Sequence, residues 1–84
     1  MTLDKLARGD IAAISGFDSS SQNEKMVAKL REIGFAEGDE VELLHRGPLG
    51  GSPLSFRLNR TIVALRKREA ALIAVRVTAS ADAA

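Results

Sequence analysis

Apolar and polar residues alternate over short stretches of the chain, in the pattern that half-buried β-strands show. The alternation is clearest in residues 40–43 and 54–58, where every second side chain is apolar. Residues 11–14, 61–65 and 72–77 are short, mainly aliphatic runs between turn signals. These patterns predict five short strands.

One segment has helical rather than β spacing. Its apolar positions share one helical face: Met26, Val27, Leu30 and Ile33. Ser21 and Glu24 have the spacing of a capping box at the start of this helix. Gly34 fits the left-handed position that ends a helix, and Phe35 is placed to fold back on Leu30. The segment therefore predicts a helix that ends at Gly34.

Turn-forming residues separate these elements. Asn59 and Arg60 predict a two-residue hairpin loop, because Asn tolerates a positive φ. Residues 47–53 are rich in Gly and Pro and predict a loop. Residues 67–71 are too few for a lasting helix and predict one helical turn. Residues 3–10 predict a short helical turn or an irregular lead-in to the first strand.

One helix inserted after the first of about five short strands predicts a mostly β fold. The arrangement is typical of a small closed or nearly closed barrel of SH3-like proportions. A chain of 84 residues is too short to form two hydrophobic cores. We therefore expect a single domain over residues 1–77 and a frayed C-terminal tail over residues 78–84.

Composition limits the chemistry that the chain can carry. It has no cysteine, so disulfides and thiolate metal sites are excluded. His45 is the only histidine, whereas a non-haem Fe(II) site usually needs two histidines and a carboxylate. We expect no bound metal and no other cofactor. No stretch approaches the roughly 20 apolar residues of a membrane span, and the N-terminus lacks a signal-peptide pattern. The expected location is the cytoplasm.

No catalytic arrangement stands out in the sequence. The Gly-rich residues 47–53 lack the Gly-Lys-Ser/Thr of a P-loop and precede a strand instead of a helix. Residues 19–21 offer hydroxyl groups near Asp18, but no base is placed to activate them. We therefore expect neither GTP binding nor enzymatic activity.

Charge is divided unevenly along the chain. Residues 1–42 carry five Lys/Arg and nine Asp/Glu, and residues 43–84 carry seven and two. Six cations could form a basic face on neighbouring strands, as nucleic-acid-binding barrels have: Arg57, Arg60, Arg66, Lys67, Arg68 and Arg76. Single-strand binders also need exposed aromatic rings, whereas Phe35 and Phe56 are placed for the core. A protein partner is therefore favoured over nucleic acid.

Four stretches of the sequence, taken in order, carry a resemblance to a known family: residues 30–41 (LREIGFAEGDEV), 48–50 (PLG), 60–66 (RTIVALR) and 69–75 (EAALIAV). In order, spacing and residue type they are similar to the FeoA family over residues 3–77. The resemblance implies an SH3-like barrel that accompanies FeoB, a ferrous-iron transporter with a cytosolic GTP-binding domain. One departure is that residues 48–50 are followed by Gly51-Ser52-Pro53, where the family usually has an Asp-Pro pair.

The resemblance implies that the protein binds the cytosolic part of a FeoB-type transporter, without entering the membrane, and modulates its assembly, transport or GTP hydrolysis. We predict that six residues on the outer helix face and nearby loops make the contact: Lys25, Lys29, Arg31, Leu49, Arg66 and Arg68. Leu49 is chosen because Gly and Pro neighbours leave little local structure to bury it, unless it folds back on the barrel. The alternative function is a free-standing SH3-like module, either of a metal-dependent regulator type or a nucleic-acid-binding barrel. The similar C-terminal domains of metal-dependent repressors follow a DNA-binding helix pair, and none precedes the predicted barrel.

Overall fold

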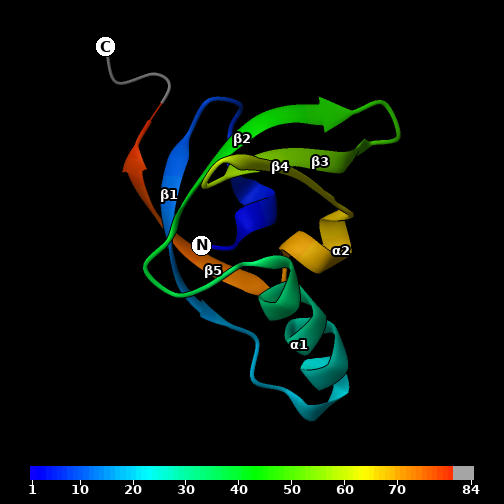
Figure 1. The fold of residues 1–84 in the computed structure, drawn as a ribbon. Helices are drawn as coiled ribbons and strands as arrows, with labels where there is room; N and C mark the ends of the chain where they lie inside the picture. Colours follow the sequence, from blue (N-terminus) through cyan, green and yellow to red (C-terminus); the bar gives the residue numbers. More distant parts are fainter. Residues whose placement is uncertain (81–84) are drawn as a thin grey trace.

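The chain folds into five strands: β1 (Ile11–Phe17), β2 (Glu40–Gly47), β3 (Gly51–Leu58), β4 (Thr61–Leu65) and β5 (Ile73–Ala79). The structure is a computed structural model, and it describes residues 1–80. The strands form one antiparallel sheet in the order β4-β3-β2-β1-β5 (Figure 1). The predicted mostly β fold, with one longer helix inserted after the first strand, is confirmed.

Two helices lie side by side at one end of this sheet (Figure 1). The longer helix, α1 (Glu24–Ile33), connects β1 to β2, and the single turn α2 (Lys67–Ala70) connects β4 to β5. Two 3-10 turns, Leu3–Lys5 and Ser21–Asn23, precede β1 and α1. The predicted helical turn after β4 is therefore present.

Two segments predicted as a loop and a tail are partly strand. β2 and β3 continue to Gly47 and Gly51, which pair with each other, so most of the loop predicted over residues 47–53 is strand. Strands pair through main-chain hydrogen bonds, which do not require alternating apolar side chains. The hairpin therefore extends beyond the residues whose alternation predicts a strand. β5 continues to Ala79, two residues into the predicted tail. Residues 81–84 of that tail lie outside the described residues.

The end of α1 has the predicted conformation. Gly34 has a φ of +129°, which an L side chain rarely adopts. Its N–H donates to the Arg31 carbonyl at 3.1 Å, and the N–H of Phe35 donates to the Leu30 carbonyl at 3.2 Å. This pair of bonds is a Schellman motif, and it turns Phe35 into the core.

The start of α1 differs from the prediction. Ser21 begins a 3-10 turn, and no side chain caps the first turn of α1. The side-chain hydrogen bonds in this segment are made by Ser20, one residue before Ser21. The Ser20 hydroxyl donates to Asp18 at 2.6 Å and accepts from the Asn23 amide at 3.1 Å. The predicted capping box of Ser21 and Glu24 is therefore wrong.

The core lies between the curved sheet, α1 and the lead-in. Its buried side chains come from every strand and both helices: Leu3, Leu6, Ala12, Ile14, Leu30, Phe35, Val41, Leu43, Leu54, Phe56, Leu58, Leu65, Ala70, Ile73 and Val75. The lead-in is held by Arg46, whose guanidinium donates to the carbonyls of Asp4, at 3.0 Å, and Leu6. Residues 3–10 are thus an integral part of the domain.

The turn between β3 and β4 is the predicted two-residue hairpin. Leu58 pairs with Thr61, and Asn59 has a φ of +56°.

Candidate docking surface

Leu49 occupies the tip of the β2–β3 hairpin and is 80% exposed. Its main chain exchanges two hydrogen bonds with Ser52, at 3.3 and 3.2 Å. Gly50 and Gly51 form the turn between them, with φ values of +67° and +88° that favour glycine. The alternative in which Leu49 folds back on the barrel is therefore wrong, and the residue belongs to a turn closed by main-chain hydrogen bonds.

Contacts of Gly47 and Ser52 hold the base of this hairpin tip in place. A Cβ on Gly47 would lie 2.6 Å from the carbonyl oxygen of Ser52, so the two strands approach too closely for any side chain there. The Ser52 hydroxyl accepts the N–H of Lys67 at 3.3 Å, which joins the hairpin to the first residue of α2. The hairpin tip and α2 therefore belong to one continuous surface.

A groove of about 450 Å³ separates α1 from α2. Its walls and floor include Asn23, Lys25, Met26, Arg68, Glu69 and Leu72. Two predicted contact residues, Lys25 and Arg68, thus face the same groove from different helices. Lys29 lies one turn beyond Lys25 on the same row of α1, and Arg66 immediately precedes α2. The structure therefore brings two of the six predicted residues, Lys25 and Arg68, to this groove, and Lys29 and Arg66 lie next to its lining segments in the chain.

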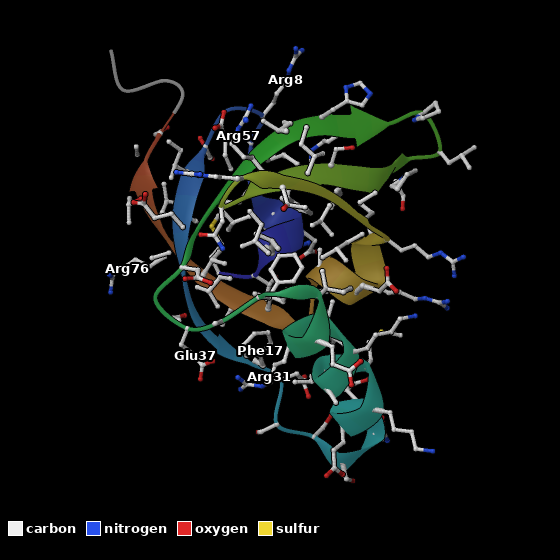
Figure 2. The ribbon with its side chains drawn as sticks, in the orientation of Figure 1. Arg8, Phe17, Arg31, Glu37, Arg57 and Arg76 are labelled. Atoms are coloured by element: carbon white, nitrogen blue, oxygen red, sulfur yellow. The ribbon has the colours of Figure 1, made fainter. Side chains whose placement is uncertain are left out.

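Arg31 has a different environment from the other predicted residues. Its guanidinium lies 4.2 Å from the centre of the Phe17 ring and 2.9 Å from the carboxylate of Glu37 (Figure 2). Its charge is thus already engaged, and it joins the end of β1 to α1 and to the loop that follows α1. Arg31 does not line the groove.

The hydrogen bond from Arg31 holds the pKa of the exposed Glu37 carboxyl below its ordinary value. We expect Arg31→Ala to raise the Glu37 pKa towards that ordinary value. A carboxyl with a depressed folded-state pKa stabilises the fold above its unfolded pKa, and this contribution is lost as pH falls through the folded pKa. NMR titration of the carboxyl carbons measures the shift. Arg57→Ala is the control, because Arg57 pairs with Glu42. An unchanged Glu37 pKa in Arg31→Ala would contradict the assignment.

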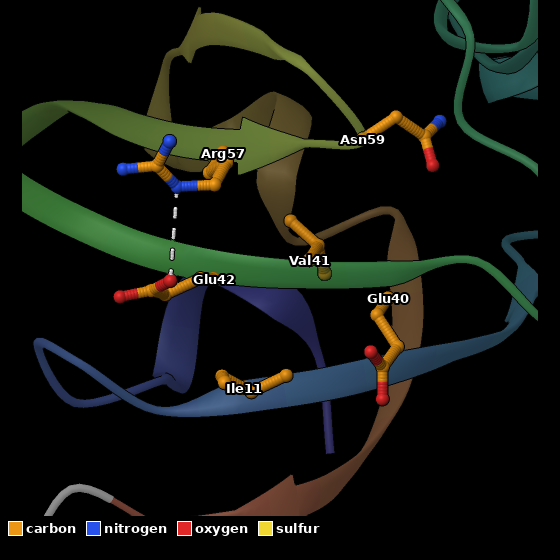
Figure 3. A pocket seen from close by; sticks show the side chains of 6 residues that line it. All are labelled: Ile11, Glu40, Val41, Glu42, Arg57 and Asn59. Atoms are coloured by element: carbon orange, nitrogen blue, oxygen red, sulfur yellow. Dashed lines mark ion pairs between the residues drawn. The ribbon is translucent and has the colours of Figure 1, made fainter.

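Sequence reasoning missed a shallow pocket of about 220 Å³ on the outer face of the sheet (Figure 3). It is lined by Ile11, Glu40, Val41, Glu42, Arg57 and Asn59. Arg57 Nε lies 3.8 Å from Glu42 Oε1, so a cation and an acid face each other across β2 and β3. The alternation in β2 puts Glu40 and Glu42 on one face, but only the β2–β3 register brings Arg57 beside them.

The structure separates Arg76 from the rest of the predicted basic face, whereas Arg57 and Arg60 stay together on the paired strands β3 and β4 and the turn between them. Arg57 is on β3 and Arg76 is on β5, and strands β2 and β1 lie between them (Figure 2). Arg57 is also paired with Glu42. The inclusion of Arg76 was wrong because β5 pairs with β1, far along the chain, and not with β4, its neighbour in sequence.

The described residues offer little for metal chemistry. His45 is exposed on β2, and within residues 1–80 no three His, Cys, Asp or Glu side chains come together in a metal-binding group. No helix in this part of the chain is long and apolar enough to cross a membrane.

Comparisons with known proteins identify one family. The model of the FeoA domain matches residues 1–77. The chain is 36% identical to FeoA of Stenotrophomonas maltophilia, a zinc-complexed SH3 domain protein, with a TM-score of 0.79 over 90% of this chain and 89% of that one. It is also 36% identical to iron(II) transport protein A from Clostridium thermocellum, with a TM-score of 0.79 over 93% of this chain and 46% of that one. The search of curated proteins finds no match.

The fold extends beyond this family. A manganese-dependent transcriptional repressor matches with a TM-score of 0.76 and 21% identity, over 92% of this chain and 40% of that one. This likeness shows a shared fold alone.

Proposed function

Because the chain belongs to the FeoA family of non-enzymatic accessory proteins of ferrous iron transport, we propose that it binds the cytosolic, GTP-binding region of a FeoB-type transporter. In this proposal the bound protein acts in the cytoplasm and modulates assembly, transport or GTP hydrolysis by the transporter. It supplies a docking surface and no catalytic group.

The observation that carries this proposal is the exposed Leu49 on a hairpin tip that main-chain hydrogen bonds close. An isolated exposed apolar residue is common, but one raised on a closed turn loses little conformational freedom when a partner covers it. The Ser52–Lys67 hydrogen bond places the cations at the start of α2 on the same surface. Protein interfaces usually have an apolar centre that is surrounded by polar and charged side chains.

Calorimetric titration of the purified cytosolic region of the transporter with this protein tests the proposal, once with GDP and once with a non-hydrolysable GTP analogue. We expect binding at about micromolar affinity, which is typical of a small transient interface, in at least one nucleotide state. The GTP hydrolysis rate measured in parallel shows whether hydrolysis is the modulated step. Absence of binding in both nucleotide states at about 100 μM protein would contradict the proposal.

A further inference from the structure

The cations around the groove between α1 and α2 are free of ion pairs. Three ion pairs occur within residues 1–80, and none involves Lys25, Lys29, Arg66, Lys67 or Arg68. The one acid that lines the groove, Glu69, accepts the main-chain N–H of Arg66 at 2.7 Å. The groove therefore has a net positive charge and cationic walls that are free to meet anionic groups of a ligand.

The floor of the groove is apolar. Met26 and Leu72 are half-buried and pack against the core with one side while the other side lines the groove. Methionine is flexible and adapts to apolar side chains of different shape. The volume of about 450 Å³ is within the range of small-ligand sites, so it suits one side chain and its neighbours better than a folded surface.

The chemistry of the groove favours a peptide over a nucleic acid. No aromatic ring lines it, since Phe35 and Phe56 are buried and Phe17 packs under Arg31. Base stacking, which gives single-strand binders much of their affinity, is therefore missing. Within residues 1–80, the acid-apolar-acid run Glu40-Val41-Glu42 is part of β2 with Val41 buried, so this run of a second copy is not exposed for binding in the groove.

We propose that this groove binds an acidic peptide segment of the partner, with an apolar side chain seated on Met26 and Leu72 and acidic residues facing Lys25 and Arg68. The inference rests on the proposed function, because it specifies which part of the transporter's cytosolic region makes the contact. Lys29 extends the cationic row along α1 for a segment longer than the groove itself.

NMR titration of the isotopically labelled protein with three short peptides tests the chemistry of the groove. The first peptide has a leucine between pairs of aspartates, the second has serine in place of leucine, and the third has lysines in place of the aspartates. We expect the first peptide to shift the amides of residues 22–26 and 68–72 and to bind about tenfold more tightly than the others. The proposal is overturned by an absence of shifts, by shifts spread over all surface cations, or by tighter binding of a single-stranded oligonucleotide at these residues.

Two double variants of equal net charge distinguish binding in the groove from attraction of the peptide by the overall charge of the protein. Lys25→Glu with Arg68→Glu reverses the charge of two residues that line the groove. Arg60→Glu with Arg76→Glu reverses the charge of two exposed residues that do not line it. We expect the groove variant to lose about tenfold in affinity for the aspartate–leucine peptide and to bind the lysine peptide more tightly than wild type. The control variant should keep the wild-type pattern of shifts. Equal losses in both variants would overturn the proposal.

Binding of the transporter's cytosolic region to the same variants distinguishes this inference from the function on which it rests. We expect the groove variant to bind that region about tenfold more weakly than the control variant. If both variants bind as wild type does, the groove inference fails while the proposed function stands. If wild type itself does not bind, the proposed function fails, and so does the assignment of the peptide to the transporter.

Discussion

Replacing Phe35 with alanine is expected to lower the free energy of unfolding by about 3 to 5 kcal/mol. Phe35 is 1% exposed and follows the Schellman turn that ends α1, so its ring fastens the helix to the barrel. The substitution removes buried apolar surface and leaves a cavity that a rigid turn cannot close. A domain this small has a total stability of only about 5 to 15 kcal/mol, so a large part of it is lost.

Urea denaturation followed by circular dichroism measures this loss. Phe17→Ala is the matched control, because Phe17 is half-buried and packs at the edge of the core beneath Arg31. We expect a clearly smaller loss in the control. Equal losses in the two variants would show that Phe35 has no special role in joining α1 to the sheet.

Replacing Leu49 with glutamate is expected to weaken binding to the transporter's cytosolic region about thirtyfold, which corresponds to about 2 kcal/mol. An apolar side chain at the centre of an interface can contribute this much, and a carboxylate in its place would have to be desolvated. The fold should be unaffected, since Leu49 is 80% exposed and its turn is held by main-chain bonds. Titration calorimetry measures binding, and a thermal melt checks the fold.

Ile62→Glu provides the matched control for this experiment. Ile62 is 64% exposed on β4, so the change is chemically the same at a site away from the hairpin tip. We expect Ile62→Glu to bind as wild type does. If Leu49→Glu also binds as wild type does, the interface lies elsewhere on the protein.

The sequence predicts those elements whose causes are local. Residues 54–58 alternate in the printed sequence and pair as β3, and Gly34 ends α1 because a left-handed residue is required there. The Asn59 turn is likewise local. In contrast, the capping box was wrong, because Ser21 is part of a 3-10 turn and the local side-chain bonds join Asp18, Ser20 and Asn23 instead.

The candidate site was predicted only in part, because grooves depend on contacts between distant segments. Lys25 and Arg68 are 43 positions apart in the sequence, and nothing local indicates that they face one groove. Arg31 is a cation on the same helix as Lys25 and Lys29, yet Phe17 and Glu37 engage it. Tertiary neighbours, not residue type, decide which cations are available.

The pairing of β1 with β5 joins the beginning of the chain to its end. Thr2 bridges to Ala74, and the Met1 carbonyl accepts the N–H of Val75 at 2.8 Å. Contacts between residues so far apart in sequence raise the contact order of the domain, which slows folding relative to helical domains of the same size. During folding, β1 can pair with β2, which is nearer in sequence, before β5 covers its other edge. Until β5 pairs with it, β1 therefore has one unprotected strand edge, and an unpaired edge is a site at which incompletely folded chains aggregate.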